Sequence, residues 1–130
     1  MKRTLYLIML PVILLVASCQ KTEYVVPNRT ILTTIQPGSW ISSNNGRTSK
    51  AAISVPEINT DFNEYGGVLV FISFGTVEYE AIPQVYNGIS YRYTTAPLQI
   101  VITIENSDGL GTVLPPGDPM DVKIILVDSN

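Results

Sequence analysis

Residues 98–105 read Leu-Gln-Ile-Val-Ile-Thr-Ile-Glu, an alternation of apolar and polar side chains interrupted only at Val101. Successive side chains of a β-strand point to opposite faces of the sheet, so every second residue lies on the same face. The side chains of the apolar face are Leu98, Ile100, Ile102 and Ile104, against Gln99, Thr103 and Glu105 on the other face. This pattern predicts a strand of an antiparallel sheet with one face in the core and the other in water.

Runs of similar length recur along the chain between turn-forming residues. Pro37-Gly38 ends the first run, and Asn45-Gly46 is a strong signal for a β-hairpin. Trp40-Ile41 opens a further strand or a bend. The runs that predict strands are residues 30–36, 50–55, 68–74, 76–82, 89–95, 98–105 and 121–128.

One stretch departs from the strand pattern. In residues 57–65, Ile58 and Phe62 are four residues apart, which suits one face of a helix, although the Asn and Asp content favours only a turn or two. Residues 68–74 are apolar on both faces at their start, which indicates a central strand. Because a parallel sheet would need helices between its strands, we predict an all-β fold, a single antiparallel β-sandwich of about seven strands with one short helical turn.

The first residues have the pattern of an export signal. Basic residues precede an apolar run of 13 residues, 5–17, which is too short for a membrane span of about 20 residues. The small residues Ala17 and Ser18 precede the only cysteine, Cys19, and this ending is similar to a bacterial lipobox, in which cleavage falls between Ser18 and Cys19 and the cysteine carries lipid. The alternatives are an ordinary signal with an incidental cysteine and a buried free thiol. The predicted regions are a signal peptide over 1–18, a lipidated tether over 19–28 and a β-sandwich domain over 29–130.

The composition excludes several classes of site. The 130 residues include 8 Lys+Arg and 11 Asp+Glu, for a net charge of −3, with no His and one Cys. Without histidine there is no Ser-His-Asp triad, Cys-His dyad or His-ligated metal centre, and one cysteine cannot form an internal disulfide. An acidic chain with scattered basic residues binds nucleic acid poorly, so we expect no nucleic-acid partner, no metal and no cofactor.

The residues after the cysteine bear on localisation. If Cys19 is acylated, each buried CH₂ of acyl chain contributes about 0.8 kcal/mol to membrane binding. Gln20 stands where Asp would be the usual inner-membrane retention signal, so the outer membrane is expected. Lys21 and Glu23 are similar to the short export tag of Bacteroidota surface lipoproteins, or are solvated tether residues. Whether the domain faces the cell surface or the periplasm stays open.

Three aromatic side chains are candidates for binding a ligand: Trp40, Tyr65 and Tyr86. An aromatic ring offers a flat apolar face and, in Tyr and Trp, a polar group, which suits stacking on a sugar ring. Core packing is the alternative for Trp40, whereas Tyr65 and Tyr86 lie near predicted turns, where exposure is expected. Tyr91 and Tyr93 fall on the apolar face of the strand predicted over 89–95, so we expect them in the core.

Acidic side chains give two weaker candidates. Glu78 and Glu80 share one face of the strand predicted over 76–82, and paired carboxylates can hydrolyse glycosides, but neighbours on one sheet face do not flank a bound sugar. A second group lies in or beside the Gly/Pro-rich loop over 106–120: Asp108, Asp118 and Asp121, near Glu105. Such oxygens can hold Ca²⁺, yet no EF-hand spacing is present. We therefore expect solvated side chains and no enzyme activity.

A set of short motifs runs through the chain after Cys19. They are Tyr24-x-x-Pro27-Asn28-x-Thr30, Trp40, Val55-Pro56-Glu57-Ile58, Asn63-Glu64-Tyr65-Gly66-Gly67-Val68-Leu69-Val70, Ile82-Pro83 and Val122-Lys123-Ile124-Ile125-Leu126-Val127-Asp128. With the lipobox, this pattern resembles small uncharacterised lipoproteins of Bacteroidota over about residues 19–130. The resemblance implies a localisation and a fold, and it assigns no activity and no catalytic residue.

Together these features predict a lipid-anchored outer-membrane lipoprotein whose β-sandwich is a non-catalytic binding or scaffold domain. Its partners would be membrane lipid, through acylated Cys19, and an unidentified protein or glycan. The alternative function is a carbohydrate-binding accessory module of a polysaccharide-uptake system, which requires exposed aromatic rings. A third reading is a small hydrolase that uses Glu78 or the loop acids.

Overall fold

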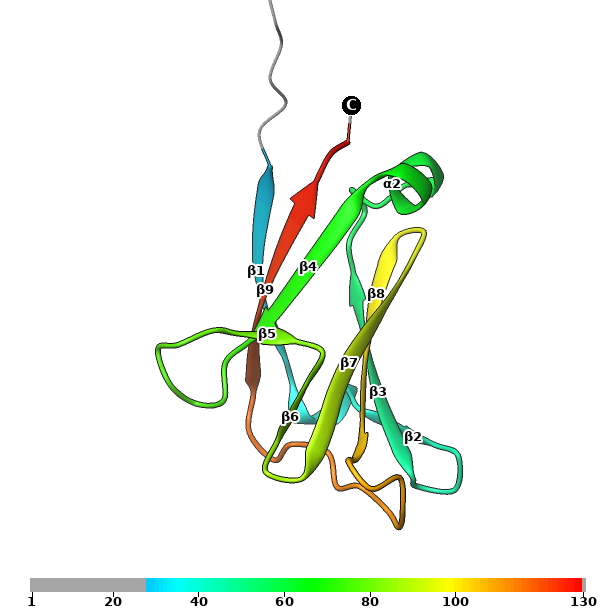
Figure 1. The fold of residues 1–130 in the computed structure, drawn as a ribbon, viewed down its shortest axis with the longest axis vertical. Coiled ribbons are helices and arrows are strands. Elements are labelled where there is room, and N and C mark those ends of the chain that lie inside the picture. The colour runs from blue at the N-terminus through cyan, green and yellow to red at the C-terminus, as the bar shows by residue number, and fades with distance from the viewer. Residues whose placement is uncertain (1–27, 130) are drawn as a thin grey trace, which may run out of the picture.

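The computed structural model describes residues 28–129, which form two antiparallel β-sheets packed face to face (Figure 1). The strand order of the four-stranded sheet is β1 (Arg29–Ile35), β9 (Met120–Val127), β4 (Gly67–Ile72) and β5 (Glu80–Ile82). The order of the five-stranded sheet is β2 (Ile41–Ser43), β3 (Thr48–Ser54), β8 (Gln99–Asn106), β7 (Ile89–Ala96) and β6 (Gln84–Tyr86). The predicted antiparallel β-sandwich is confirmed, with nine described strands in place of about seven. The predicted signal peptide, with Ser18 and Cys19, and the tether up to residue 27 lie outside the described residues.

The core lies between the inner faces of the two sheets. Strand β8 contributes three side chains with no exposed surface, Ile100, Ile102 and Ile104, as its alternation predicts. From the other sheet, β9 contributes Ile124, which pairs in register with the buried Val70 of β4. The Tyr93 hydroxyl of β7 donates a hydrogen bond to the Val68 carbonyl of β4 at 2.6 Å, so the core also contains a polar link between the two sheets.

The described chain passes between the two sheets four times. Strand β1 leads to β2 through the 3₁₀ turn η1 (Pro37–Ser39), and β3 leads to β4 through the short helix α2 (Thr60–Tyr65). Strand β5 leads directly into β6 at Pro83, whose peptide bond to Ile82 is cis, and β8 leads to β9 through the loop over 107–119. Each sheet is therefore assembled from segments that lie far apart in the sequence.

Helix α2 is short because both of its ends are fixed locally. The side chain of Asn59 accepts a hydrogen bond from the Phe62 N–H at 2.7 Å, which caps the first turn. At the other end a Cβ on Gly66 would lie 2.8 Å from the Phe62 ring and carbonyl oxygen, so this close approach requires glycine. The helical turn predicted within 57–65 is confirmed. No helix in the described part of the chain is long and apolar enough to cross a membrane.

The β2–β3 hairpin forms at the predicted Asn45-Gly46. Asn44, Asn45 and Gly46 have φ angles of 52°, 55° and 81°, in the left-handed region that Asn and Gly tolerate best. At the base of the turn the hydroxyls of Ser43 and Thr48 are hydrogen-bonded at 2.6 Å. The hairpin prediction is therefore confirmed.

Two strand predictions are wrong in part. Residues 76–79 belong to a loop rather than to a strand, because the Ser73 hydroxyl donates to the Thr76 carbonyl at 2.6 Å and holds a turn. Val77, predicted to share an apolar strand face, is 97% exposed in that loop. Leu98 is 58% exposed because its φ of 70° places it in the turn before β8 begins. The three-residue strand β6 had no counterpart among the predicted runs.

Candidate functional site

The three aromatic candidates lie in different environments. Trp40 is in the core with 8% of its surface exposed, so its ring is not available for stacking on a ligand. Tyr65, the last residue of α2, is 68% exposed, and Tyr86, the last residue of β6, is 39% exposed. Figure 1 shows α2 and the turn after β6 at opposite ends of the sandwich, so the two exposed rings do not form one stacking platform.

A hollow of about 220 Å³ lies beside Tyr86. Phe74 stacks on Tyr86 with ring centroids 4.0 Å apart and planes 19° apart, and Tyr91 meets Phe74 edge-on at 5.0 Å. The wall is completed from the loop before β9 by Pro116, Asp118 and Pro119. Burial raises the pKa of the Tyr91 hydroxyl, and the neighbouring Tyr86 raises it further, so this group is protonated at neutral pH. The hollow thus combines aromatic rings with a carboxylate.

Two adjoining hollows, of about 480 and 510 Å³, lie where α2 meets the start of β1 and the end of β9. Glu57 and Phe62 line both of them, and Tyr65 lines the second. The Arg29 guanidinium lies 3.4 Å from the Glu57 carboxylate. Both partners of this ion pair are partly exposed, so water screens it and it adds little stability.

The acidic candidates do not come together. Glu78 lies in the loop before β5, and Glu80 opens β5, so the two carboxylates do not share a strand face. Asp108 accepts a hydrogen bond from a backbone N–H of its own loop at 2.9 Å, and Asp121 accepts one from the Thr34 hydroxyl at 2.8 Å. Among residues 28–129, no three His, Cys, Asp or Glu side chains are grouped so that they could hold a metal ion.

Sequence reasoning missed a group of apolar side chains on the outer face of the four-stranded sheet. The central strand predicted over residues 68–74 is confirmed up to Ile72, since β4 lies between β9 and β5. Its outward side chains Leu69 and Phe71 are apolar as well, and so are two of the four outward side chains of β9, Ile125 and Val127. The apolar side chains that point away from the core, here called the apolar face, are Leu32, Leu69, Phe71, Ile125 and Val127. The signal that could have found this face was the apolar character of residues 68–74 on both sides.

The strand register brings together the part of the apolar face on β4 and β9, whereas Lys123 separates Leu32 on β1 from Phe71. Ile125 of β9 stands beside Leu69 of β4, and Lys123 stands between Leu32 of β1 and Phe71 of β4. Leu32 and Leu69 are 67% and 48% exposed. The Lys123 ammonium lies 4.9 Å from the centroid of the Phe71 ring and 4.7 Å from that of Tyr79. The one charge in the middle of this face is therefore held over aromatic rings.

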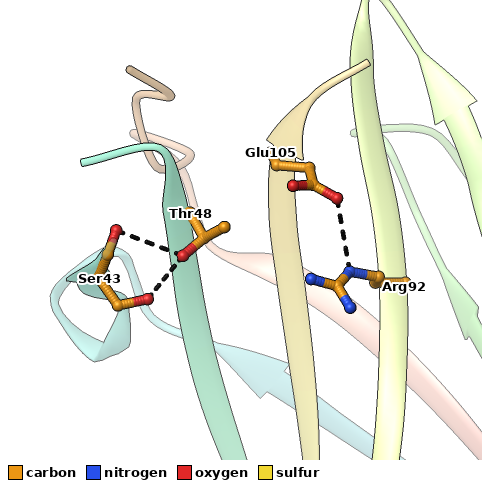
Figure 2. A network of polar contacts seen from close by, with 4 residues as sticks. All are labelled: Ser43, Thr48, Arg92 and Glu105. Carbon is orange, nitrogen blue, oxygen red and sulfur yellow. Dashed lines mark hydrogen bonds and ion pairs between the residues drawn. The ribbon is translucent and has the colours of Figure 1, made fainter. Parts of the chain in front are cut away.

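The outer face of the five-stranded sheet is mainly polar, although Ile41, which pairs with Lys50, is 72% exposed on it. Figure 2 shows two contacts on it, the Ser43–Thr48 hydroxyl pair at 2.6 Å and the Arg92–Glu105 ion pair at 3.6 Å. Strand register places further polar side chains beside them, among them Lys50, Ser54, Thr94, Gln99 and Thr103. Most of these polar side chains are in water, whereas Thr48 and Thr103 are buried among their neighbours on the face.

Comparisons with protein-family models, with curated proteins and with solved structures found no match to this chain. What the domain binds must therefore be inferred from the chemistry of its surfaces.

Proposed function

We propose that this protein is a lipid-anchored outer-membrane lipoprotein whose β-sandwich is a non-catalytic domain that binds another protein. The observation that carries the binding role is the apolar face, where Leu32 and Leu69 are 67% and 48% exposed. Contiguous apolar surface exposed to water is costly, and on folded proteins it marks sites where other molecules bind. The cores of protein–protein interfaces are likewise apolar with few charges.

The anchor part of the proposal is supported by sequence. Small residues before the sole Cys19, after a basic start and a short apolar run, fit a lipobox. Residues 19–27 would reach at most about 30 Å when fully extended. A domain on such a tether stays close to the membrane surface, where it meets other envelope proteins.

Metabolic labelling with an alkyne analogue of palmitate tests the anchor. The wild-type chain is expected to take up the label and to sediment with membranes. The variant Cys19→Ala is expected to lose the label, whereas Gln20→Ala is expected to keep it. Equal labelling of the Cys19→Ala variant contradicts the proposal.

Chemical crosslinking in intact cell envelopes tests the binding role. Leu69→Lys places a charge in the apolar face, and we expect it to abolish the crosslinked complex. Leu110→Lys is the matched control, because Leu110 is 66% exposed in the loop over 107–119 and its carbonyl accepts a hydrogen bond from Asn106 of β8 in the other sheet. A complex that survives Leu69→Lys unchanged contradicts binding through the apolar face.

Carbohydrate binding is the second candidate function, and the hollow beside Tyr86 favours it. Tyr86 is 39% exposed and stacks on Phe74 next to Asp118, and an aromatic ring beside a carboxylate suits a sugar ring with its hydroxyls. A glycan screen with the chain from Gln20 onward tests this candidate. Saturable binding that is lost in a folded Tyr86→Ala variant and kept in Tyr65→Ala would favour it over a protein partner.

A further inference from the structure

The four edges of the two sheets are unequal. Three of them are strands of three residues, β2, β5 and β6. The fourth edge is β1, with seven residues. Among the described residues, β1 pairs only with β9, so one side of its backbone offers unpaired N–H and C=O groups.

Strand β1 also lacks the features by which proteins protect an edge. Natural edges are kept short or carry charges, prolines or bulges, because a long regular edge invites pairing with another strand. Between Arg29 and Ile35 the sequence is Thr-Ile-Leu-Thr-Thr, without charge or proline. The register with β9 runs without a bulge from one end to the other. In the middle stands Leu32, 67% exposed.

We propose that β1 pairs with β1 of a second copy of this chain, antiparallel and two-fold symmetric about Leu32. In an antiparallel pair, two residues stand directly opposite each other only when both direct their N–H and C=O groups toward the partner strand or both direct them away from it. For two identical strands, the opposed residue numbers must therefore be both even or both odd. The two-fold axis then passes between one residue and the same residue of the second copy. An axis at Leu32 uses all seven residues of β1.

The occupant is a second copy because the edge complements itself. In this register Leu32 meets Leu32, and Thr30 of one copy meets Thr34 of the other; both are favourable cross-strand pairs. Arg29 falls opposite Ile35, so no charge meets a like charge, and Arg29 is already paired with Glu57 in its own copy at 3.4 Å. The pairing also joins the apolar faces of the two copies into one wider surface.

Disulfide trapping tests the pairing, because Cys19 is the only cysteine of the chain. A chain from Gln20 onward contains both sheets and the whole described core, and has no thiol. We expect Leu32→Cys in this chain to form a disulfide-linked dimer, since directly opposed residues have Cβ atoms about 4.5–5.5 Å apart. Leu69→Cys lies on the same face but away from the edge, and we expect it to crosslink about tenfold more slowly or not at all.

The proposed register can be tested separately from the pairing itself. A mixture of Thr30→Cys and Thr34→Cys chains is expected to form the mixed dimer readily, and each chain alone is not. For the unoxidised protein, sedimentation at increasing concentration should show a dimer that Leu32→Lys abolishes, by opposing two ammonium groups, and Leu69→Lys leaves intact. The Leu69→Lys result separates this pairing from the partner binding proposed above.

The contact area of one strand pair is small, so the dimer is expected to be weak in solution and more populated on a membrane, where copies are concentrated. The trapping is therefore repeated with the full chain in membranes, where an acylated Cys19 supplies no thiol. Leu69→Cys that crosslinks as fast as Leu32→Cys would show face-to-face association and overturn the proposal. A Leu32→Cys chain that stays monomeric both in solution and in membranes overturns it as well.

Discussion

The two outer faces of this sandwich differ although the two inner faces are alike. The inner faces carry fully buried isoleucines, such as Ile124 and Ile102. On the outer side of the five-stranded sheet, polar side chains such as Thr48 and Arg92 make contacts with their neighbours. On the outer side of the four-stranded sheet the side chains are mainly apolar. Stability requires only the inner faces to be apolar, so the apolar side chains of this outer face are the surface on which the proposed binding role rests.

The largest expected effect on stability is the difference between alanine substitutions on the inner and outer sides of β9. Ile124→Ala, on the inner side, should destabilise the domain by about 2–5 kcal/mol because it leaves a cavity in the core. Ile125→Ala, on the apolar face, should cost about 1 kcal/mol. Urea titrations with unchanged m-values would measure both. Equal costs would mean that the apolar face is packed as a core is.

On the polar outer face a single hydroxyl should have a smaller effect. Thr48→Val removes the hydrogen bond to Ser43 at 2.6 Å and should cost about 0.5–1.5 kcal/mol. Thr94→Val is the matched control, because Thr94 is exposed on the same face. We expect it to change the free energy of unfolding by less than about 0.5 kcal/mol. If both variants lower the free energy of unfolding by a similar amount, the Ser43–Thr48 hydroxyl pair does not stabilise the domain.

The Lys123 ammonium in the apolar face should stabilise the folded domain through cation–π contacts with the aromatic rings beside it. Lys123→Met keeps the shape of the side chain but removes the ammonium that lies over Phe71 and Tyr79, and should cost about 0.5–1 kcal/mol. Lys50→Met, on the polar face, should be close to neutral. Thermal unfolding compares the two, and an unchanged stability of Lys123→Met would contradict the cation–π role.

The smallest expected change in stability is that of Leu69→Lys, which replaces an apolar side chain of the apolar face with a charged one. Leu69→Lys should alter the free energy of unfolding by less than about 0.5 kcal/mol, because Leu69 is 48% exposed. It should nevertheless lower the binding of a hydrophobic dye to the folded protein. Ala52→Lys, at an exposed position of β3, should leave dye binding unchanged. A dye signal that Leu69→Lys does not affect would place the accessible apolar surface elsewhere.

The sequence predicts the inner faces well because alternation reports directly on burial. Ile100, Ile102 and Ile104 are buried as expected. Leu98 has the same spacing but is exposed, because its own backbone has a left-handed φ and forms the turn before β8. Hydrophobic periodicity does not detect such a turn. Val77 is exposed for a similar reason, because a loop hydrogen bond ends the strand pattern that its neighbours suggest.

The candidate sites were harder to predict from the sequence. Tyr65 and Tyr86 are exposed, as their positions near turns indicated, but only the fold shows that they lie at opposite ends. The hollow beside Tyr86 also depends on Phe74 and on a loop that comes about thirty residues later, a contact that no local pattern contains. The apolar face was missed because an apolar residue on a strand gives the same sequence pattern whether its side chain is buried in the protein or exposed to water.

The place of β9 has a consequence for how the protein is made. This strand lies between β1 and β4, so β1 has no partner in its sheet until the last described strand emerges. In a chain that is exported N-terminus first, β1 would cross the membrane well before β9 and could pair with it only after β9 has crossed. Such late closure across a long sequence separation slows folding. If the chain is exported as proposed, this connectivity delays closure of the four-stranded sheet until β9 has crossed the membrane.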